Sequence, residues 1–249
     1  MTDLSLTYLD TNIKLMINDF QTFRKYFLLQ NGNNWDWLGQ PNGFQSWVQR
    51  KLVHILNVTR SMINWQFDSL LDIGSGVSLF AIAAKQLNPN LKIYLVDYND
   101  IHFDSDFKFY NDSPTAGYYN SWSVVEDLIN SNGLDRRDFV FLDPTDAWPD
   151  SVDFVRSRAS WCWHYPFETY WYQVQQLLRD KGQLWVDIYW REDLDVVETI
   201  NNFIGHQPRS VQLMHKNIIK NRFNQIRPLQ QAHVIGDYFA GSYSWIKSM

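Results

Sequence analysis

The stretch Leu70-Leu71-Asp72-Ile73-Gly74-Ser75-Gly76-Val77-Ser78 decides the fold. Its apolar half predicts a buried strand over residues 69–73, which ends at a Gly-x-Gly turn. Residues 79–87 then predict a helix that stops at Asn88-Pro89, and residues 91–96 predict the next strand. A strand, a helix and a strand in this order form a βαβ unit, so the sequence predicts a parallel sheet.

The turn is followed by an acid, Asp97, at the end of the second predicted strand. Glycines after a first parallel strand let a ligand approach the backbone, and an acid about 20 residues later can bind a ribose diol. Leu79 occupies the position where a dinucleotide-binding fingerprint needs a third small residue, which argues against NAD or FAD. Asp72 adds negative charge suited to an ammonium or sulfonium group. These residues therefore predict a nucleoside cofactor with a positive charge.

The rest of the chain continues the alternation of strands and helices. We expect a long acidic and aromatic connection over residues 97–119 and a helix near residue 122 that ends at Asn132-Gly133. A later helix over 168–178 is predicted to be capped by Gly182. The N-terminal part predicts amphipathic helices at 9–28 and 44–62, joined by an ordered loop. The remaining predicted elements are strands at 139–142, 152–155, 184–189, 211–219 and 242–246, and a helix at 196–203.

Three motifs occur in order along the chain: Asp72-Ile73-Gly74-Ser75-Gly76, Asp97 and Asp146-Ala147. In this order they resemble the motifs of the class I S-adenosylmethionine-dependent methyltransferases. The resemblance covers residues 69–189 and extends plausibly to the C-terminus. It implies a Rossmann-like, doubly wound α/β fold, with a mostly parallel seven-stranded sheet, helices on both faces and an N-terminal helical extension. We expect residues 1–64 to form that extension, a lid, and residues 65–249 to form one compact core.

The resemblance also implies the residues that hold S-adenosylmethionine, whose product is S-adenosylhomocysteine. Asp97 would hold the ribose, and either Asp146 or Asp143 would contact the adenine. The full set of expected cofactor-binding residues is Asp72, Ile73, Gly74, Ser75, Gly76, Asp97, Tyr98, Asp146, Ala147 and Ser157.

The segment after the fourth core strand contains the candidate catalytic residues. His164 is the leading general base, because a histidine near neutral pH can take the proton of a hydroxyl acceptor. Its alternative role is to anchor the loop by hydrogen bonds, and Tyr165 would then orient the acceptor. Cys162 has no identifiable base and is not assigned as a nucleophile. Asp187-Ile188-Tyr189 lacks the Asp-Asn pair of metal-dependent O-methyltransferases, so no metal is assigned.

Composition limits the acceptor. The formal net charge is −5, which disfavours general nucleic-acid binding, and no Pro-Pro pair of the DNA amino-methyltransferase type occurs. We therefore expect a small-molecule acceptor, methylated at oxygen, such as a sugar or another hydroxylated metabolite. RNA methylation and non-catalytic binding of S-adenosylmethionine are the alternatives. A basic stretch can receive an anionic acceptor, but it is more often a solvated face or a partner of the acidic segment, and that explanation is preferred here. Its residues are Arg209, Lys216, Lys220, Arg222 and Arg227.

Cysteine content and hydropathy indicate the compartment. The single cysteine cannot form an internal disulfide, which fits a reducing compartment. The first ten residues lack a basic leader, and no apolar run approaches the roughly 18 residues of a membrane-spanning helix. We expect a cytoplasmic protein without membrane contact. The sequence does not determine the oligomeric state.

Overall fold

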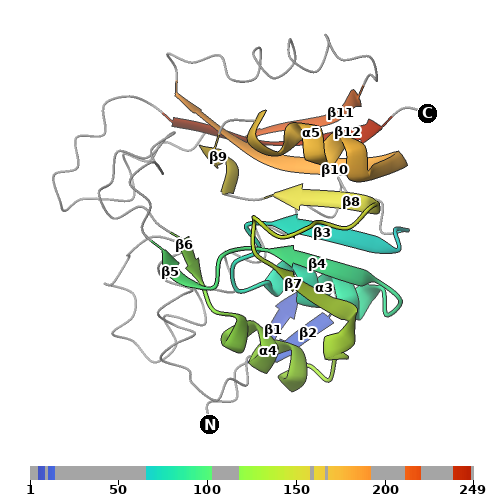
Figure 1. The fold of residues 1–249 in the computed structure, drawn as a ribbon, viewed down its shortest axis with the longest axis vertical. Coiled ribbons are helices and arrows are strands. Elements are labelled where there is room, and N and C mark those ends of the chain that lie inside the picture. The colour runs from blue at the N-terminus through green and yellow to red at the C-terminus, as the bar shows by residue number, and fades with distance from the viewer. Residues whose placement is uncertain are drawn as a thin grey trace, which may run out of the picture. The chain divides into compact units, whose positions relative to one another are not determined.

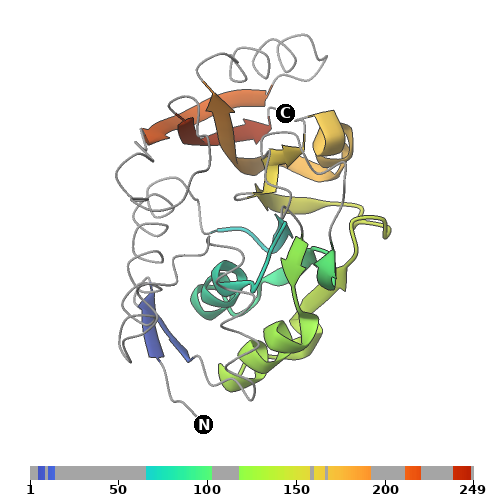
Figure 2. The same cartoon turned by 90° about the vertical axis from the view of Figure 1, so that its left-hand side faces the viewer.

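The computed structural model describes the chain in eight stretches and is shown in Figures 1 and 2. These stretches are residues 5–8, 11–14, 66–102, 118–157, 160–165, 168–191, 211–219 and 238–247. The chain forms two compact units. The first contains residues 1–104 and 117–149, and the second contains residues 105–116 and 150–249.

The first unit is built on three parallel strands (Figure 1): β3 (Ser69–Ile73), β4 (Lys92–Val96) and β7 (Phe139–Leu142). Strand β4 lies between the other two, with Leu71 opposite Tyr94 and Leu95 opposite Phe141. Every residue of β3 is buried, as expected for a strand covered on both faces. The predicted strands at 69–73 and 139–142 are confirmed at both ends, and the predicted strand at 91–96 begins one residue later.

Two helices connect these strands. Helix α3 (Leu79–Leu87) joins β3 to β4, and helix α4 (Trp122–Ser131) lies between β4 and β7. Both crossovers step in the same direction along the sheet, so right-handed connections place both helices on one face (Figure 2). The predicted ends of both helices are confirmed. Asn88 is the last-turn cap of α3, and Gly133, with φ of +66°, follows the cap of α4.

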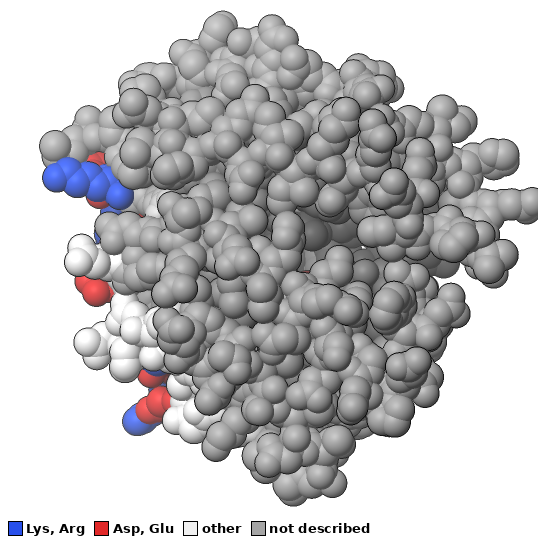
Figure 3. Space-filling view, turned by 180° about the vertical axis from the view of Figure 1, so that it is seen from behind, with Lys and Arg blue, Asp and Glu red and all other residues white. Residues whose placement is uncertain are grey.

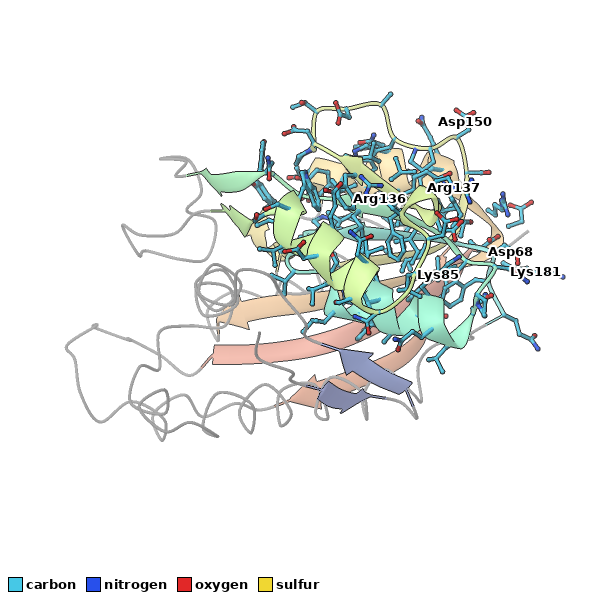
Figure 4. The ribbon with its side chains drawn as sticks, turned by 90° about the horizontal axis from the view of Figure 1, so that it is seen from below. Asp68, Lys85, Arg136, Arg137, Asp150 and Lys181 are labelled. Carbon is cyan, nitrogen blue, oxygen red and sulfur yellow. The ribbon has the colours of Figure 1, made fainter. Side chains whose placement is uncertain are left out.

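A buried lysine secures the end of α3 (Figure 4). The Lys85 ammonium donates to the carbonyl oxygens of Pro89, at 2.5 Å, and Leu91, at 2.8 Å. It also forms an ion pair of 2.8 Å with Asp138 in the 3-10 helix η2 (Arg136–Asp138). Lys85 is only 4% exposed, so these three oxygens replace the water that its charge loses on burial. The contacts hold α3, the start of β4 and the segment before β7 together.

The second unit contains four strands in the order β11-β12-β10-β8. They are β8 (Val152–Ser157), β10 (Leu178–Arg191), β11 (Val211–Ile219) and β12 (Tyr238–Lys247). Strand β10 pairs parallel with β8 and antiparallel with β12, which also pairs antiparallel with β11. Helix α5 (Glu168–Leu177) connects β9 (Ser160–Tyr165) to β10. The predicted strand at 211–219 is confirmed at both ends.

Aromatic side chains fill the interior of the second unit. Trp161, Trp171 and Trp185 are at most 1% exposed, and Phe154 is fully buried. Each indole supplies a large apolar area to the core, which agrees with the high aromatic content of the sequence. Packing therefore accounts for these tryptophans without a ligand.

The N-terminal prediction is wrong where the structure describes the chain. Residues 11–14 were predicted to begin a helix, but they form β2 (Thr11–Lys14), antiparallel to β1 (Ser5–Tyr8). The helical period counted from residue 9 ignores the preceding segment, which offers residues 11–14 a pairing partner. The rest of both predicted N-terminal helices, and the predicted helix at 196–203, lie outside the described residues. The boundary at residue 64 stays a prediction.

The structure differs from the predictions at the connection after Asp97 and at Gly182. The long connection after Asp97 contains a short antiparallel ladder between β5 (Asp100–His102) and β6 (Tyr118–Asn120), which brings its two ends together. Gly182 is not a helix cap, because it lies inside β10, where the pairing with β8 is irregular between Leu178 and Gln183. The left-handed residue of this segment is Lys181, with φ of +63°.

Gly182 instead permits close backbone packing, which leads to a testable prediction. A Cβ at this position would lie 2.7 Å from the Arg179 carbonyl oxygen and 3.0 Å from that of Asp153. We expect Gly182→Ala to lower the free energy of unfolding by about 2–3 kcal/mol, since backbone atoms cannot move aside cheaply. Urea unfolding followed by circular dichroism measures the change.

Gly133→Ala provides the matched control. A Cβ there meets nothing within 4 Å, so only the positive φ is unfavourable, at about 1 kcal/mol. Equal losses in the two variants, or no loss at Gly182, would contradict the packing explanation.

Candidate functional site

The glycine turn lies at the carboxyl end of β3 and is fastened to the end of β4. The amides of Gly74 and Ser75 donate to the Val96 carbonyl oxygen at 2.8 and 3.3 Å. Gly74 and Gly76 have φ values of +70° and +54°, a conformation that favours glycine because it has no Cβ. The turn thereby exposes backbone rather than side chains at this strand end. The predicted turn at the end of this strand is confirmed.

Asp97 joins the ends of all three strands of the first unit. Its Oδ2 accepts a hydrogen bond of 2.7 Å from the Gly76 amide, and its Oδ1 accepts one of 2.9 Å from the Tyr98 amide. Its own amide donates to the carbonyl oxygen of Leu142, the last residue of β7, at 3.1 Å. Each carboxylate oxygen has capacity for a second donor. Two hydroxyl groups on adjacent carbons match that capacity.

Burial and neighbouring acids strongly perturb this carboxyl group. Desolvation raises the pKa of Asp97 from 3.8 to about 7, although the hydrogen bonds from Gly76 and Tyr98 lower it. The negative charges of Asp72 and Asp143 raise it further. Asp72 is fully buried and Asp97 is 9% exposed. Three acids from adjacent strand ends thus make this corner electronegative, which suits a ligand with a positive charge and hydroxyl donors.

The two candidate adenine contacts, Asp143 and Asp146, form one turn after β7. Asp146 Oδ2 accepts from the Asp143 amide at 2.7 Å, and the Asp146 amide donates to the Asp143 carbonyl oxygen at 2.9 Å. Asp143 Oδ1 accepts from both the amide and the hydroxyl of Thr145. Asp146 and Ala147 are exposed, whereas the charge of Asp143 acts on Asp97.

Ser75 supplies an independent indication of a ligand. Its hydroxyl oxygen is buried in the middle of the glycine turn and has no hydrogen-bond partner. Buried polar groups are nearly always satisfied, so an orphaned hydroxyl in a turn of this kind suggests that a bound molecule completes it. This observation, the two left-handed glycines and the Asp97 carboxylate fit the polar and ribose groups of S-adenosylmethionine.

The catalytic candidates His164 and Tyr165 belong to the second unit, as does Ser157, which was predicted to bind the cofactor. Ser157 ends β8, is buried, and accepts a hydrogen bond of 3.0 Å from the Trp161 amide through its hydroxyl oxygen. Tyr165 ends β9 and packs edge-on against Tyr170, with ring centroids 5.8 Å apart. His164 lies in β9, but its side chain is outside the described part of the chain. The roles proposed for these residues therefore stay predictions.

Sequence reasoning missed the residues that fix the start of α4. The Trp122 amide donates to Asn99 Oδ1 at 3.1 Å, and the Ser121 amide donates to Asn120 Oδ1 at 2.7 Å. Asn120 is fully buried, and its Nδ2 has no hydrogen-bond partner. The signal available in the sequence was Asn-Ser directly before an apolar helical pattern, which is typical of a helix N-terminus.

The described residues contain neither a metal-binding cluster nor a membrane-spanning helix. Among the described side chains, no group of three or more His, Cys, Asp or Glu is placed to hold a metal ion. No described helix has the length and hydropathy needed to span a bilayer. In Figure 3 the described Lys and Arg side chains lie beside Asp and Glu, so neither sign dominates the part of this face that the structure describes.

Comparison with known proteins identifies the fold. The sequence matches no protein-family model and no curated protein. Among solved structures, the chain is similar to residues 961–1257 of StiE O-MT, with 12% sequence identity and a TM-score of 0.58. The similarity covers 100% of this chain and 86% of the StiE O-MT chain. Residues 942–1257 of StiE O-MT give the same coverage, at 13% identity and a TM-score of 0.56. A methyltransferase from Pyrococcus furiosus covers 79% of this chain and 83% of its own, at 12% identity and a TM-score of 0.48.

Identities this low establish likeness of fold alone. The predicted Rossmann-like α/β fold is confirmed. Of the seven strands that correspond to the predicted sheet, β3, β4 and β7 belong to the first unit, and β8, β10, β11 and β12 belong to the second. That all seven form one sheet, with helices on both faces, stays a prediction.

Proposed function

We propose that this protein is an S-adenosylmethionine-dependent methyltransferase. The observation that carries the proposal is the Asp97 carboxylate, held by the Gly76 amide beside a turn of left-handed glycines. Asp97 would accept the two ribose hydroxyls, and the backbone and hydroxyl of Ser75 would bind the amino-acid portion. Asp72 would favour the cationic donor electrostatically. When bound, S-adenosylmethionine supplies an activated methyl group.

Of the two acids after β7, we propose that Asp143 contacts the adenine. Both acids accept hydrogen bonds within the turn, Asp146 from the Asp143 amide and Asp143 from Thr145, so position rather than occupancy separates them. The carboxylate of Asp143 is near enough to Asp97 to raise its pKa, so it lies beside the proposed ribose position. Asp146 would then shape the turn without touching the ligand.

We further propose a small-molecule acceptor with a hydroxyl group, such as a sugar. His164 would take the hydroxyl proton as general base, and Tyr165 would orient the acceptor. The net charge of −5 supports a small acceptor over nucleic acid, and the name StiE O-MT agrees with transfer to oxygen. The basic stretch from Arg209 to Arg227 favours RNA as the second candidate acceptor.

Calorimetry and a methyl-release assay test this function. We expect S-adenosylmethionine and S-adenosylhomocysteine to bind and NAD not to bind. Turnover should occur with a metabolite extract that has been treated with ribonuclease, and His164→Ala should retain binding while losing most turnover. Binding of NAD in preference to S-adenosylmethionine would contradict the proposed cofactor. Activity that disappears with ribonuclease would support the RNA alternative, and binding with no turnover on any extract would support a non-catalytic role.

A further inference from the structure

We propose that Asn120 reads the nucleobase of the ligand, by donating a hydrogen bond from Nδ2 to a ring nitrogen. This inference rests on the proposed function, because it needs a nucleoside held by Asp97. It concerns a residue outside the glycine turn and outside the turn that Asp143 and Asp146 form. Its basis is a buried donor with no partner at the end of the sheet where the nucleoside would lie.

The position of Asn120 follows from contacts within the first unit. Its Cα pairs with Asp100 in the β5–β6 ladder, three residues after Asp97. The next helix is tied to the end of β4 by the 3.1 Å bond from the Trp122 amide to Asn99. It is tied to β7 by the Trp122 ring, which stacks on Phe141 with centroids 4.6 Å apart. Asn120 thus lies beside the strand ends that carry Asp97 and Asp143.

The order of the strands places a base rather than an amino acid at this corner. The sheet runs β3-β4-β7, with the glycine turn after β3, the ribose carboxylate Asp97 after β4 and Asp143 after β7. Suppose that the ribose lies at the middle strand, β4, and the amino-acid portion of the ligand lies at the glycine turn. The base of the nucleoside then extends toward β7. The start of α4 is fixed on that side by Trp122 and Phe141.

The chemistry of Asn120 selects a neutral acceptor. Its Oδ1 already accepts from the Ser121 amide at 2.7 Å, whereas its Nδ2 has no partner, so the unsatisfied group is the NH₂ donor. An anion is disfavoured because Asp72, Asp97 and Asp143 already make the corner electronegative. An uncharged heteroaromatic nitrogen accepts from an amide without adding negative charge. The Nδ2 atom of Asn120 is buried in the structure. Ligand binding must therefore be accompanied by a local rearrangement that makes this atom accessible to the base.

The test combines one substitution with ligands that each lack one ring nitrogen. The probes are S-adenosylhomocysteine and its 1-deaza, 3-deaza and 7-deaza analogues, with affinities measured by calorimetry. We expect the wild-type protein to bind one analogue about 5- to 10-fold more weakly than the parent. Asn120→Ala should bind that analogue and the parent about equally. Asn130→Ala, at an exposed asparagine of helix α4, should discriminate as the wild type does.

A second measurement does not depend on the variant folding. In the wild-type protein, the nitrogen-15 side-chain resonances of Asn120 should shift with S-adenosylhomocysteine and shift less with the discriminated analogue. The inference is overturned if the wild type binds all four ligands equally, or if Asn120→Ala keeps the same discrimination. In that case binding of the parent ligand, and its loss in Asp97→Ala, would leave the proposed function standing. If the wild type binds no S-adenosylhomocysteine, the proposed function and this inference both fail.

Discussion

Replacement of Asp97 by alanine is expected to weaken binding of S-adenosylmethionine by about 100-fold or more. The carboxylate would lose two charge-assisted hydrogen bonds to the ribose hydroxyls. The substitution also removes the 2.7 Å bond that fixes the Gly76 amide, so the glycine turn would lose its anchor. Calorimetry with S-adenosylmethionine and S-adenosylhomocysteine measures both affinities.

Two further variants serve as a control and as a partial loss of the carboxylate. Asp150→Ala removes an exposed acid and should bind as the wild type does. Asp97→Asn keeps one acceptor oxygen and should retain part of the affinity. If Asp97→Ala binds within about threefold of the wild type, Asp97 is not the ribose ligand and the proposed function loses its principal support.

The stability of the ligand-free protein is expected to fall as the pH rises from about 4 to about 7. Asp97 has a pKa of about 7 when folded, compared with an ordinary value of 3.8. The folded state therefore binds this proton more tightly than the unfolded state does. The stability linked to it is fully present below the ordinary pKa and is lost as the pH passes through the folded pKa. The full loss corresponds to about 4 kcal/mol.

Urea unfolding of the wild type and of Asp97→Asn, at about pH 5 and about pH 8, isolates this contribution from other acids. Asparagine does not titrate, so the variant should gain stability relative to the wild type at the higher pH. We expect the difference between the two proteins to change by at least about 2 kcal/mol across this range. A difference that stays constant would show that Asp97 titrates near its ordinary pKa.

Much of the fold is predictable because local sequence and tertiary environment agree. Residues 69–73 are apolar except at Ser69 and Asp72, and a short apolar run that ends in Gly-x-Gly has few alternatives to a buried strand. Helix α3 is rich in alanine and leucine and stops before a proline, so propensity and end signals agree. The strands at 139–142 and 211–219 were found for similar reasons. Prediction failed at residues 11–14, whose strand depends on pairing with residues 5–8.

Some candidate site residues are recognisable in the sequence, whereas others are recognisable only in the folded structure. The glycine turn and Asp97 are recognisable in the sequence, because their spacing reflects one βαβ unit. The sequence pattern pointed to Asp146 with Asp143 as the alternative, and the different hydrogen bonds of the two acids appear only once the turn is folded. Asn120 was missed because its importance comes from burial and an unsatisfied amide. Gly182 was misassigned as a cap because its close approach to Asp153 involves a neighbouring strand.

The sequence by itself determined the βαβ unit, the glycine turn and the acid that closes the second strand. These depend on interactions between residues close in the chain, so periodicity and turn chemistry suffice to predict them. Tertiary structure alone decided the raised pKa of Asp97, the arrangement of the acids around it and the unpartnered amide of Asn120. Desolvation and charge repulsion depend on distances between strand ends that are far apart in the sequence, and those distances exist only after the sheet has formed.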